Sequence, residues 1–113
     1  AGVHQFCRIG EGAMVGGGSI LVMDVPPFVI CNGNPAEPHG LNVVGLRRTG
    51  YDLKALNAFK AAYKTIYRDG LRIPEAIQVL DVLISNNPQV ARELQLMRDF
   101  IATSERGIIR PKA

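Results

Sequence analysis

Histidine is the residue type in this sequence that most directly suggests catalysis. It is the side chain most often used as a general base, because its ordinary pKa of ~6.5 lies close to neutral pH. The chain contains two histidines, and His4 is the tempting base because it stands in the first unit of a repeat described below. The alternative interpretation is a surface histidine at a corner of the fold, so the residue type alone leaves the role of His4 open.

The two cysteines, Cys7 and Cys31, are the other residues with reactive side chains. Their spacing fits no metal-binding motif, and two thiols are too few for a domain built on disulfides. Small buried hydrophobic side chains in a reducing compartment are the simpler interpretation. We therefore predict no metal site.

The composition excludes several classes of protein. The chain has 113 residues, of which 47% are hydrophobic and 20% charged, which is typical of a globular protein and not of a disordered or fibrous one. No apolar run reaches the ~18 residues of a membrane-spanning helix, and no signal peptide is visible, so we expect a cytoplasmic protein. The net charge of +3 favours an acidic partner, whether a carrier protein, a nucleotide or a lipid surface.

Aliphatic side chains recur every six residues, at Val3, Ile9, Val15 and Leu21. Four residues after each comes a compact side chain, at Cys7, Ala13, Ser19 and Val25. One large and one small inward position per unit suits a short strand followed by a tight corner, whereas helices repeat near 3.6 residues and strands near 2. The spacing therefore predicts a parallel β-helix in which three units, about 18 residues in all, form one triangular coil. A glycine-rich loop with fortuitous spacing is the alternative.

The repeat is short and has a visible end. About one and a half coils fit into residues 1–34, fewer than the roughly three repeats that a solenoid needs. We therefore expect further coils N-terminal to Ala1 or from another chain. Pro26 and Pro27 end the repeat because proline removes amide donors and fixes φ. Val29–Ile30 is expected as a last short strand, and Gly33-Asn34-Pro35 is expected to turn the chain away.

The second part of the chain has helical periodicity. We predict residues 1–34 as the last coils, 35–50 as a connector with a short helical turn near 42–48, and 51–113 as an all-α C-terminal domain. Asp52 caps a helix to about Asp69, Pro74 opens one to about Ser85, and Pro88 opens one to about Thr103. The expected buried stripes are Leu53, Leu56, Phe59, Tyr63, Ile66 and Tyr67; Ile77, Leu80 and Leu83 or Ile84; and Val90, Leu94, Met97 and Ile101.

Several segments together resemble one known family. They are Val3-His4-Gln5-Phe6-Cys7, the six-residue units, the run Asp24-Val25-Pro26-Pro27-Phe28, the segment from Asn42 to Arg48, and the ending Ser104-Glu105-Arg106-Gly107-Ile108-Ile109-Arg110. Together they resemble the acyl-carrier-protein:UDP-N-acetylglucosamine O-acyltransferases. The repeat and its proline exit are shared by many hexapeptide transferases, whereas the other segments are more specific.

This resemblance implies a fold and a reaction. The fold is a left-handed parallel β-helix, of which this chain holds only the terminal coils, followed by the helical domain. The enzyme is a homotrimer that transfers a 3-hydroxyacyl group from acyl carrier protein to the 3-hydroxyl of UDP-N-acetylglucosamine, the first step of lipid A synthesis. The resemblance implies no cofactor, no metal and no nucleic acid. Its catalytic base belongs to coils upstream of Ala1, so the chain alone is expected to be inactive.

The resemblance also assigns roles to individual residues. It places His4 and Gln5 at the nucleotide sugar, with His4 lining the cleft rather than acting as base, and it places Asn42 and Arg48 near the uridine and phosphates. Gly17, with Met14 beside it, lines the groove for the acyl chain, where glycine leaves room for a longer chain. Two residues depart from the family pattern: Val44 stands where an acidic residue is usual, and Thr49 where a second arginine is common. A separate cluster of basic residues is interpreted by default as a solvated helix face, and its functional alternative is a docking patch for an acidic acyl carrier protein; it comprises Lys54, Lys60, Lys64, Arg68 and Arg72.

Two other functions fit parts of the pattern. A related hexapeptide transferase, which moves an N-acyl or acetyl group, would also have the six-residue units and the proline exit. A non-catalytic trimeric scaffold would use the helical tail only for assembly. The three predicted helices and the segment from Asn42 to Arg48 count against the first alternative.

Overall fold

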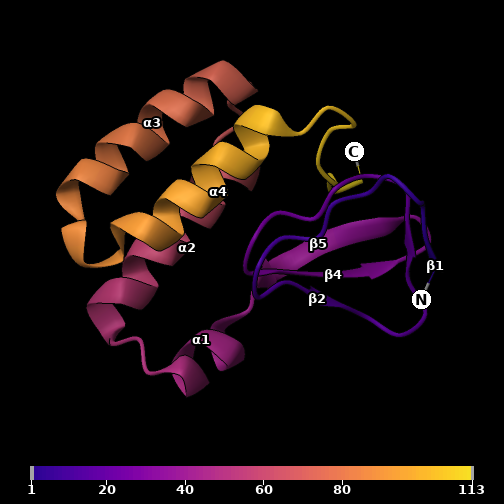
Figure 1. The fold of residues 1–113 in the computed structure, drawn as a ribbon, viewed down its shortest axis with the longest axis horizontal. Coiled ribbons are helices and arrows are strands. Elements are labelled where there is room, and N and C mark those ends of the chain that lie inside the picture. Colours follow the sequence, from indigo (N-terminus) through magenta and orange to yellow (C-terminus); the bar gives the residue numbers. More distant parts are fainter. Residues whose placement is uncertain (1, 113) are drawn as a thin grey trace.

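The computed structural model describes residues 2–112 and contains a strand region followed by helices (Figure 1). The strands are β1 (Gly2–Val3), β2 (Met14–Val15), β3 (Ile20–Leu21), β4 (Val29–Gly33) and β5 (Ala36–Leu41). The helices are α1 (Val43–Thr49), α2 (Leu53–Tyr67), α3 (Ile73–Asn86) and α4 (Ala91–Thr103), with a 3-10 turn at Pro88–Val90. Helix α2 contacts β5, α3 and α4.

Tight turns follow one another every six residues in the first part of the chain. Each turn is closed by a backbone hydrogen bond, from Cys7 N to His4 O at 2.9 Å, from Ala13 N to Gly10 O at 3.2 Å, and from Ser19 N to Gly16 O at 3.1 Å. After three turns the chain returns alongside itself, with β3 parallel to β1 and Leu21 opposite Val3. The predicted period and the predicted three-unit coil are therefore confirmed.

Burial of the repeat increases from the first coil to the second. Ser19, Leu21 and Val25 are almost completely buried. By contrast Val3 and Ile9 are 47% and 46% exposed, because the described residues cover the first coil on one side only. Leu21, in the second coil, is therefore buried as expected. The expected burial of Val3 and Ile9 is not found in the described residues.

The second coil is shorter than the first. Ile9 pairs with Val25 and Met14 with Ile30, a separation of sixteen residues, whereas Gly2 pairs with Ile20, a separation of eighteen. The segment at Gly33-Asn34-Pro35, which has a cis Asn34–Pro35 bond, does not turn the chain away as expected. It sends the chain back, so that β5 pairs antiparallel with β4. Residues 35–50, expected as a connector, therefore contain a strand and helix α1.

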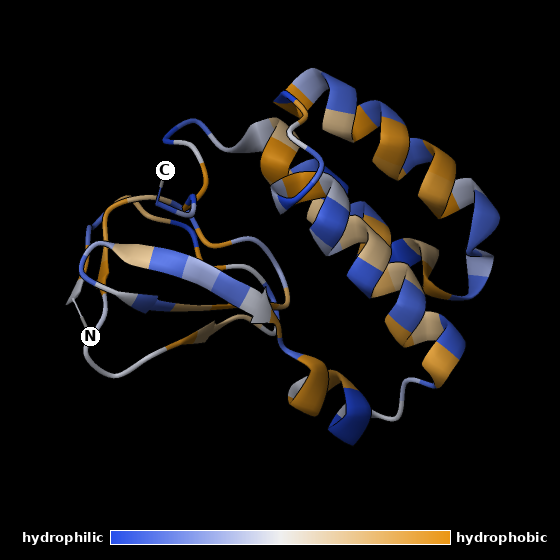
Figure 2. Ribbon diagram, turned by 180° about the vertical axis from the view of Figure 1, so that it is seen from behind, coloured by the Kyte–Doolittle hydropathy of each residue, from blue (hydrophilic) through white to orange (hydrophobic). Residues whose placement is uncertain are grey.

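The helices begin where the sequence signals them. The Asp52 side chain caps α2 by accepting from Ala55 N at 2.9 Å, and Pro74 lies in the first turn of α3. In Figure 2 the helices carry alternating hydrophobic and hydrophilic residues, as amphipathic helices do. The predicted stripes lie in or against the core with one exception, since Leu53 is 66% exposed and its predicted burial is wrong.

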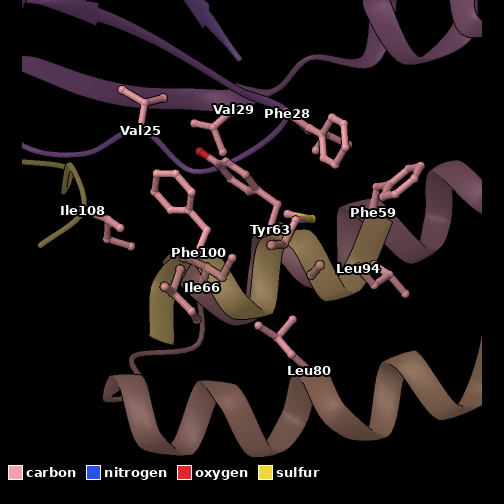
Figure 3. Close-up of a cluster of buried hydrophobic side chains, with 14 of the residues drawn as sticks. Val25, Phe28, Val29, Phe59, Tyr63, Ile66, Leu80, Leu94, Phe100 and Ile108 are labelled. Carbon is pink, nitrogen blue, oxygen red and sulfur yellow. The ribbon is translucent and has the colours of Figure 1, made fainter. Parts of the chain in front are cut away.

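Side chains from both parts of the chain form one hydrophobic cluster. Figure 3 shows Val25, Phe28 and Val29 facing residues from the helices, among them Phe59, Tyr63 and Phe100. The Phe28 ring lies 5.5 Å from the Phe59 ring between centroids. Phe28 has a φ of 65°, a left-handed conformation that costs about 1–2 kcal/mol in a residue with a side chain. The aromatic contacts of Phe28 therefore hold a backbone conformation that is locally unfavourable.

The end of the chain comes back to the coils. After α4 the chain returns to the strand region (Figure 1), and Ile108 forms a parallel bridge with Asp24. Asp24 N donates to Gly107 O at 2.9 Å, and Ile109 N donates to Asp24 O at 2.8 Å. The Asp24 carboxylate, 1% exposed, accepts from Arg8 N at 2.8 Å and from the Ser104 hydroxyl at 2.6 Å. The sequence patterns did not predict this isolated bridge between the coil and the end of the chain.

Tyr67 predicts a measurable dependence of stability on alkaline pH. Its hydroxyl is buried without a hydrogen-bond partner in the described part of the chain, and burial raises the pKa of Tyr67 far above its usual range. The folded state therefore holds this proton more tightly than the unfolded state does. The contribution of the protonated Tyr67 to the free energy of unfolding is therefore complete below the ordinary tyrosine pKa of ~10, and it falls as the pH rises above that value.

Tyr67→Phe removes the unpartnered hydroxyl. We expect the free energy of unfolding at neutral pH to stay equal or rise by about 1 kcal/mol, and its loss above pH ~10 to be smaller than in the wild type. Urea unfolding at several pH values measures both. A loss of stability at neutral pH would show instead that the hydroxyl makes a stabilising hydrogen bond.

Candidate functional site

His4 and Gln5 lie in the first tight turn, and both side chains are exposed. The turn is held to the second coil by His4 N, which donates to Leu21 O at 2.9 Å. The imidazole of His4 has two neighbours: Phe6 N lies 3.4 Å from Nδ1, and the Arg106 guanidinium lies 3.4 Å from Nε2. No carboxylate is hydrogen-bonded to His4 within the described residues, so nothing there orients it as the base of a catalytic pair.

A cleft of about 580 Å³ lies between this turn and the returning end of the chain. It is lined by Phe6, Arg8, Met23, Asp24, Thr103, Glu105 and Arg106. The Arg8 guanidinium stacks over the Phe100 ring at 4.4 Å and donates to the Thr103 hydroxyl at 3.0 Å. The cleft therefore combines aromatic, aliphatic, basic and acidic side chains near His4.

Asn42 has a structural task that the sequence did not show. It caps α1, accepting from Gly45 N at 3.1 Å through Oδ1, and its Nδ2 donates to Gly12 O at 3.0 Å. Only 8% of Asn42 is exposed, and it lines a cavity of about 210 Å³ together with Phe28 and Thr49. Because both ends of the amide are already engaged, any ligand contact by Asn42 would have to share these bonds.

Leu46 of this segment is buried, whereas the residues singled out from the sequence are open to solvent. Arg48 is exposed on α1, and Val44 is 62% exposed. The Thr49 hydroxyl donates to Gly45 O at 2.9 Å and so takes part in the helix rather than projecting toward a ligand. Of the three side chains, only Arg48 has the charge to bind a phosphate.

Met14 and Gly17 lie near the third turn. Met14 is 55% exposed on β2. A Cβ atom built on Gly17 would meet nothing within 4 Å. The space beside Gly17 is therefore open, as it is beside Gly18.

The structure does not bring these candidate residues together within one chain. His4 and Gln5 are in the turn that stacks beside Leu21, whereas Asn42 contacts Gly12 in the turn that stacks beside Phe28. Gly17 is in the third turn, which stacks beside Cys31 and Asn32. Three successive turns of one coil point away from one another, so the candidates occupy three separate corners.

The basic side chains on and after α2 are only partly free. Lys64 pairs with Asp69 at 2.8 Å and Arg72 with Glu75 at 3.5 Å. Within residues 2–112, Lys54, Lys60 and Arg68 form no ion pair and are exposed. The patch that remains is smaller than the five residues that the sequence indicated. A shallow groove between α2 and α3, lined among others by Leu53, Lys54 and Leu83, lies beside it.

The cysteines are free thiols, and burial raises the pKa of Cys31. Cys31 is fully buried and Cys7 partly so, which agrees with their interpretation as small hydrophobic side chains. Across residues 2–112, no three His, Cys, Asp or Glu side chains are grouped so that they could hold a metal ion. None of the described helices has the length and apolar character needed to cross a membrane.

Comparison with known proteins identifies the family. The sequence model for domain 2 of UDP-N-acetylglucosamine O-acyltransferase matches residues 24–109. The chain belongs to the UDP-N-acetylglucosamine O-acyltransferase family. It is 47% identical to the acyl-[acyl-carrier-protein]–UDP-N-acetylglucosamine O-acyltransferase of Paraburkholderia phymatum over 97% of this chain, and 48% identical to that of Burkholderia orbicola over the same share. The chain spans 42% of the length of each of these relatives.

Solved structures show the same fold. The UDP-N-acetylglucosamine O-acyltransferase of Moraxella catarrhalis matches with a TM-score of 0.89 and 44% identity, over 96% of this chain and 41% of that one. The Arabidopsis UDP-N-acetylglucosamine acyltransferase matches with a TM-score of 0.78 and 38% identity, over 95% of this chain and 39% of that one. The family resemblance that the sequence indicated is therefore confirmed.

Two glycines of the coil provide a matched pair for testing the turns. A Cβ atom at Gly10 would lie 2.3 Å from Pro27 N, in the backbone of the stacked coil, whereas one at Gly17 meets open space. We expect Gly10→Ala to lower the free energy of unfolding by about 1–3 kcal/mol, because the two coils must move apart. Gly17→Ala should change it by less than ~0.5 kcal/mol. Urea unfolding of the two variants measures the difference, and equal effects would contradict the stacking described for Gly10.

Proposed function

We propose that this chain is the C-terminal portion of an enzyme that transfers a 3-hydroxyacyl group from acyl carrier protein to the 3-hydroxyl of UDP-N-acetylglucosamine, the first step of lipid A biosynthesis. The observation that carries the proposal is the match of residues 24–109 to the family's domain 2, together with the agreement of nearly the whole chain with a solved member at 44% identity. Because the chain spans 42% of its relatives, the activity belongs to the whole protein.

The coils are, in this proposal, the end of a left-handed parallel β-helix. Support comes from the turn every six residues and from the parallel return after three turns. Such a solenoid is an exception to the right-handed rule for parallel crossover connections. The half-exposed Val3 and Ile9 on the first coil would be covered by a further coil stacked on it.

We propose a homotrimer because the family resemblance implies one, and the separate positions of the candidate residues are compatible with a site between subunits. His4, the Asn42–Gly12 contact and Gly17 belong to three different turns of the coil. Side chains on separate corners of one triangular coil cannot face the same small ligand, whereas corners of neighbouring subunits packed side by side can. We therefore propose that the active site lies between subunits.

The chemistry is an acyl transfer without a covalent enzyme intermediate. A general base takes the proton of the sugar 3-hydroxyl, its oxygen attacks the thioester carbonyl, and a hydrogen-bond donor stabilises the oxyanion. The C–S bond then breaks, and the phosphopantetheine sulfur leaves with a proton. In the family the base belongs to upstream coils, and His4 in this chain has no orienting carboxylate within residues 2–112 that would make it the base.

The remaining roles concern binding. His4 and Gln5 contact the nucleotide sugar, and Arg48, exposed on α1, contacts the phosphates. Asn42 acts near the uridine mainly by fixing α1 against Gly12, since its amide is engaged at both ends. Acyl carrier protein, which is acidic, docks beside Lys54, Lys60 and Arg68 in a salt-dependent encounter. The enzyme acts in the cytoplasm.

A grafted enzyme tests the proposed reaction. Residues 1–113 replace the matching segment of the Moraxella catarrhalis enzyme, which is 44% identical in this region. We expect the graft to acylate UDP-N-acetylglucosamine with a 3-hydroxyacyl carrier protein, at a rate within about tenfold of the parent, because its base is intact and this chain supplies the other binding residues. Mass spectrometry of the nucleotide sugar detects the product.

The control is the unaltered Moraxella catarrhalis enzyme in the same assay. A graft that assembles into a trimer and yet transfers no acyl group would overturn the proposal in favour of a scaffold. A graft that transfers acetyl groups from coenzyme A instead would assign the chain to another class of hexapeptide transferase.

The open space beside Gly17 predicts selectivity for acyl length. We expect Gly17→Met, made in the grafted enzyme, to favour shorter acyl donors, because the side chain fills the groove where the end of a long chain lies. A pocket discriminates by at least about tenfold for each methylene that it excludes. Values of kcat/KM for a series of 3-hydroxyacyl carrier proteins measure the shift. Gly18→Met is the matched control, since Gly18 has equally open surroundings; an equal shift in both variants would contradict a specific role for Gly17.

A further inference from the structure

The imidazole of His4 lies between two groups that can only donate hydrogen bonds. Phe6 N–H lies 3.4 Å from Nδ1, and an Arg106 Nη atom lies 3.4 Å from Nε2. A backbone amide and a guanidinium have no acceptor to offer. Each ring nitrogen of His4 can therefore accept a hydrogen bond from its neighbour only if that nitrogen carries no proton.

A neutral imidazole cannot satisfy both neighbours. It has one N–H and one lone pair, so only one of the two contacts can be a hydrogen bond at a time. The Arg106 donor is charged, and charge-assisted hydrogen bonds are roughly twice as strong as neutral ones. The Arg106 contact therefore prevails, which leaves the proton of His4 on Nδ1.

Contacts made by the residues before and after Arg106, and by its own side chain, hold Arg106 in place. Before it, the Ser104 hydroxyl donates to the buried Asp24 carboxylate at 2.6 Å. After it, Gly107 N donates to the Ser104 hydroxyl oxygen at 3.1 Å, and Gly107 has a φ of 94° that favours glycine. A second Nη atom of Arg106 donates to Val22 O at 3.1 Å, on the neighbouring coil. The guanidinium is thus fixed against two successive coils.

We propose that Arg106 is a positioning residue, which the Ser104–Asp24 contact holds in place and which fixes the orientation and the Nδ1–H tautomer of His4. The tautomer of His4 is a property of this contact and holds whatever the function of the protein is. Its effect on catalysis rests on the proposed function, in which His4 contacts the nucleotide sugar. His4 then offers that ligand a proton donor in a constant place, since the ring is tied to the end of the chain.

Nitrogen NMR of the chain labelled with ¹⁵N-histidine tests the tautomer directly. At pH about 8.5, where ordinary imidazoles are neutral, the wild type is expected to show a protonated Nδ1 and an unprotonated Nε2 for His4. In Arg106→Met the proton moves to Nε2, because Nδ1 can then accept from Phe6 N. His39, which is exposed on β5, should give the same signals in both spectra.

A wild-type His4 protonated on Nε2 overturns the proposal, as does the same tautomer in the wild type and the variant. The wild-type spectrum decides even where Arg106→Met folds poorly. The grafted enzyme gives the same readout, with the His4 signals identified by their loss in His4→Gln.

Kinetics of the grafted enzyme test the consequence for binding. Arg106→Met is expected to raise KM for UDP-N-acetylglucosamine about tenfold, the effect of one well-placed hydrogen bond, with kcat changed by less than about twofold. Arg110→Met, at an exposed arginine of the same segment, is the control and leaves KM unchanged. An unchanged KM in an active Arg106→Met graft overturns the catalytic part of the proposal. A graft with no acyl transfer at all contradicts the proposed function instead and leaves the NMR result standing.

Discussion

The buried carboxylate of Asp24 connects parts of the chain that are far apart in sequence. It is 1% exposed, and its two oxygens accept from Arg8 N in the first coil and from Ser104 at the end of α4. A buried carboxylate is strongly destabilising unless donors surround it. The first coil, the second coil and the returning end of the chain must therefore all be in position together. The parallel bridge between Asp24 and Ile108 adds the backbone of the same residue to this connection.

The local rules of the sequence predicted the turns and the helices well. The six-residue spacing of Val3, Ile9 and Val15 marks the three closed turns, and Asp52 and Pro74 mark the helix starts. These features depend on neighbours a few residues away, which a sequence displays. Strand β5 and the Asp24–Ile108 bridge were not predicted, because they depend on pairing with strands already folded. The exposure of Leu53 was not predicted for a similar reason. The helical period shows which residues share one face of the helix, but not how far along the helix that face is packed against the core.

The candidate site shows the same division. The family resemblance supplied His4, Gln5, Asn42, Arg48, Met14 and Gly17. The six-residue period already separates His4 from Gly17, but no pattern could show that Asn42 contacts the turn between them. Nor could it show that the Asn42 amide is engaged by Gly12 and Gly45. Arg106 lies 102 residues from His4 in sequence, and no local motif links them. The family resemblance included Arg106 in the C-terminal segment, but it did not show that Arg106 contacts His4.

The parallel strands of a solenoid present unpaired amide and carbonyl groups at the end of the stack, and such edges are templates for pairing with other molecules. In this protein the side of the coil at Asp24–Val25 is covered by Ile108, and the side at β4 is covered by β5, which runs in the opposite direction. An antiparallel strand and a bridge from the chain's own end cannot continue the stack. Coverage on these two sides therefore works against end-to-end fibre growth.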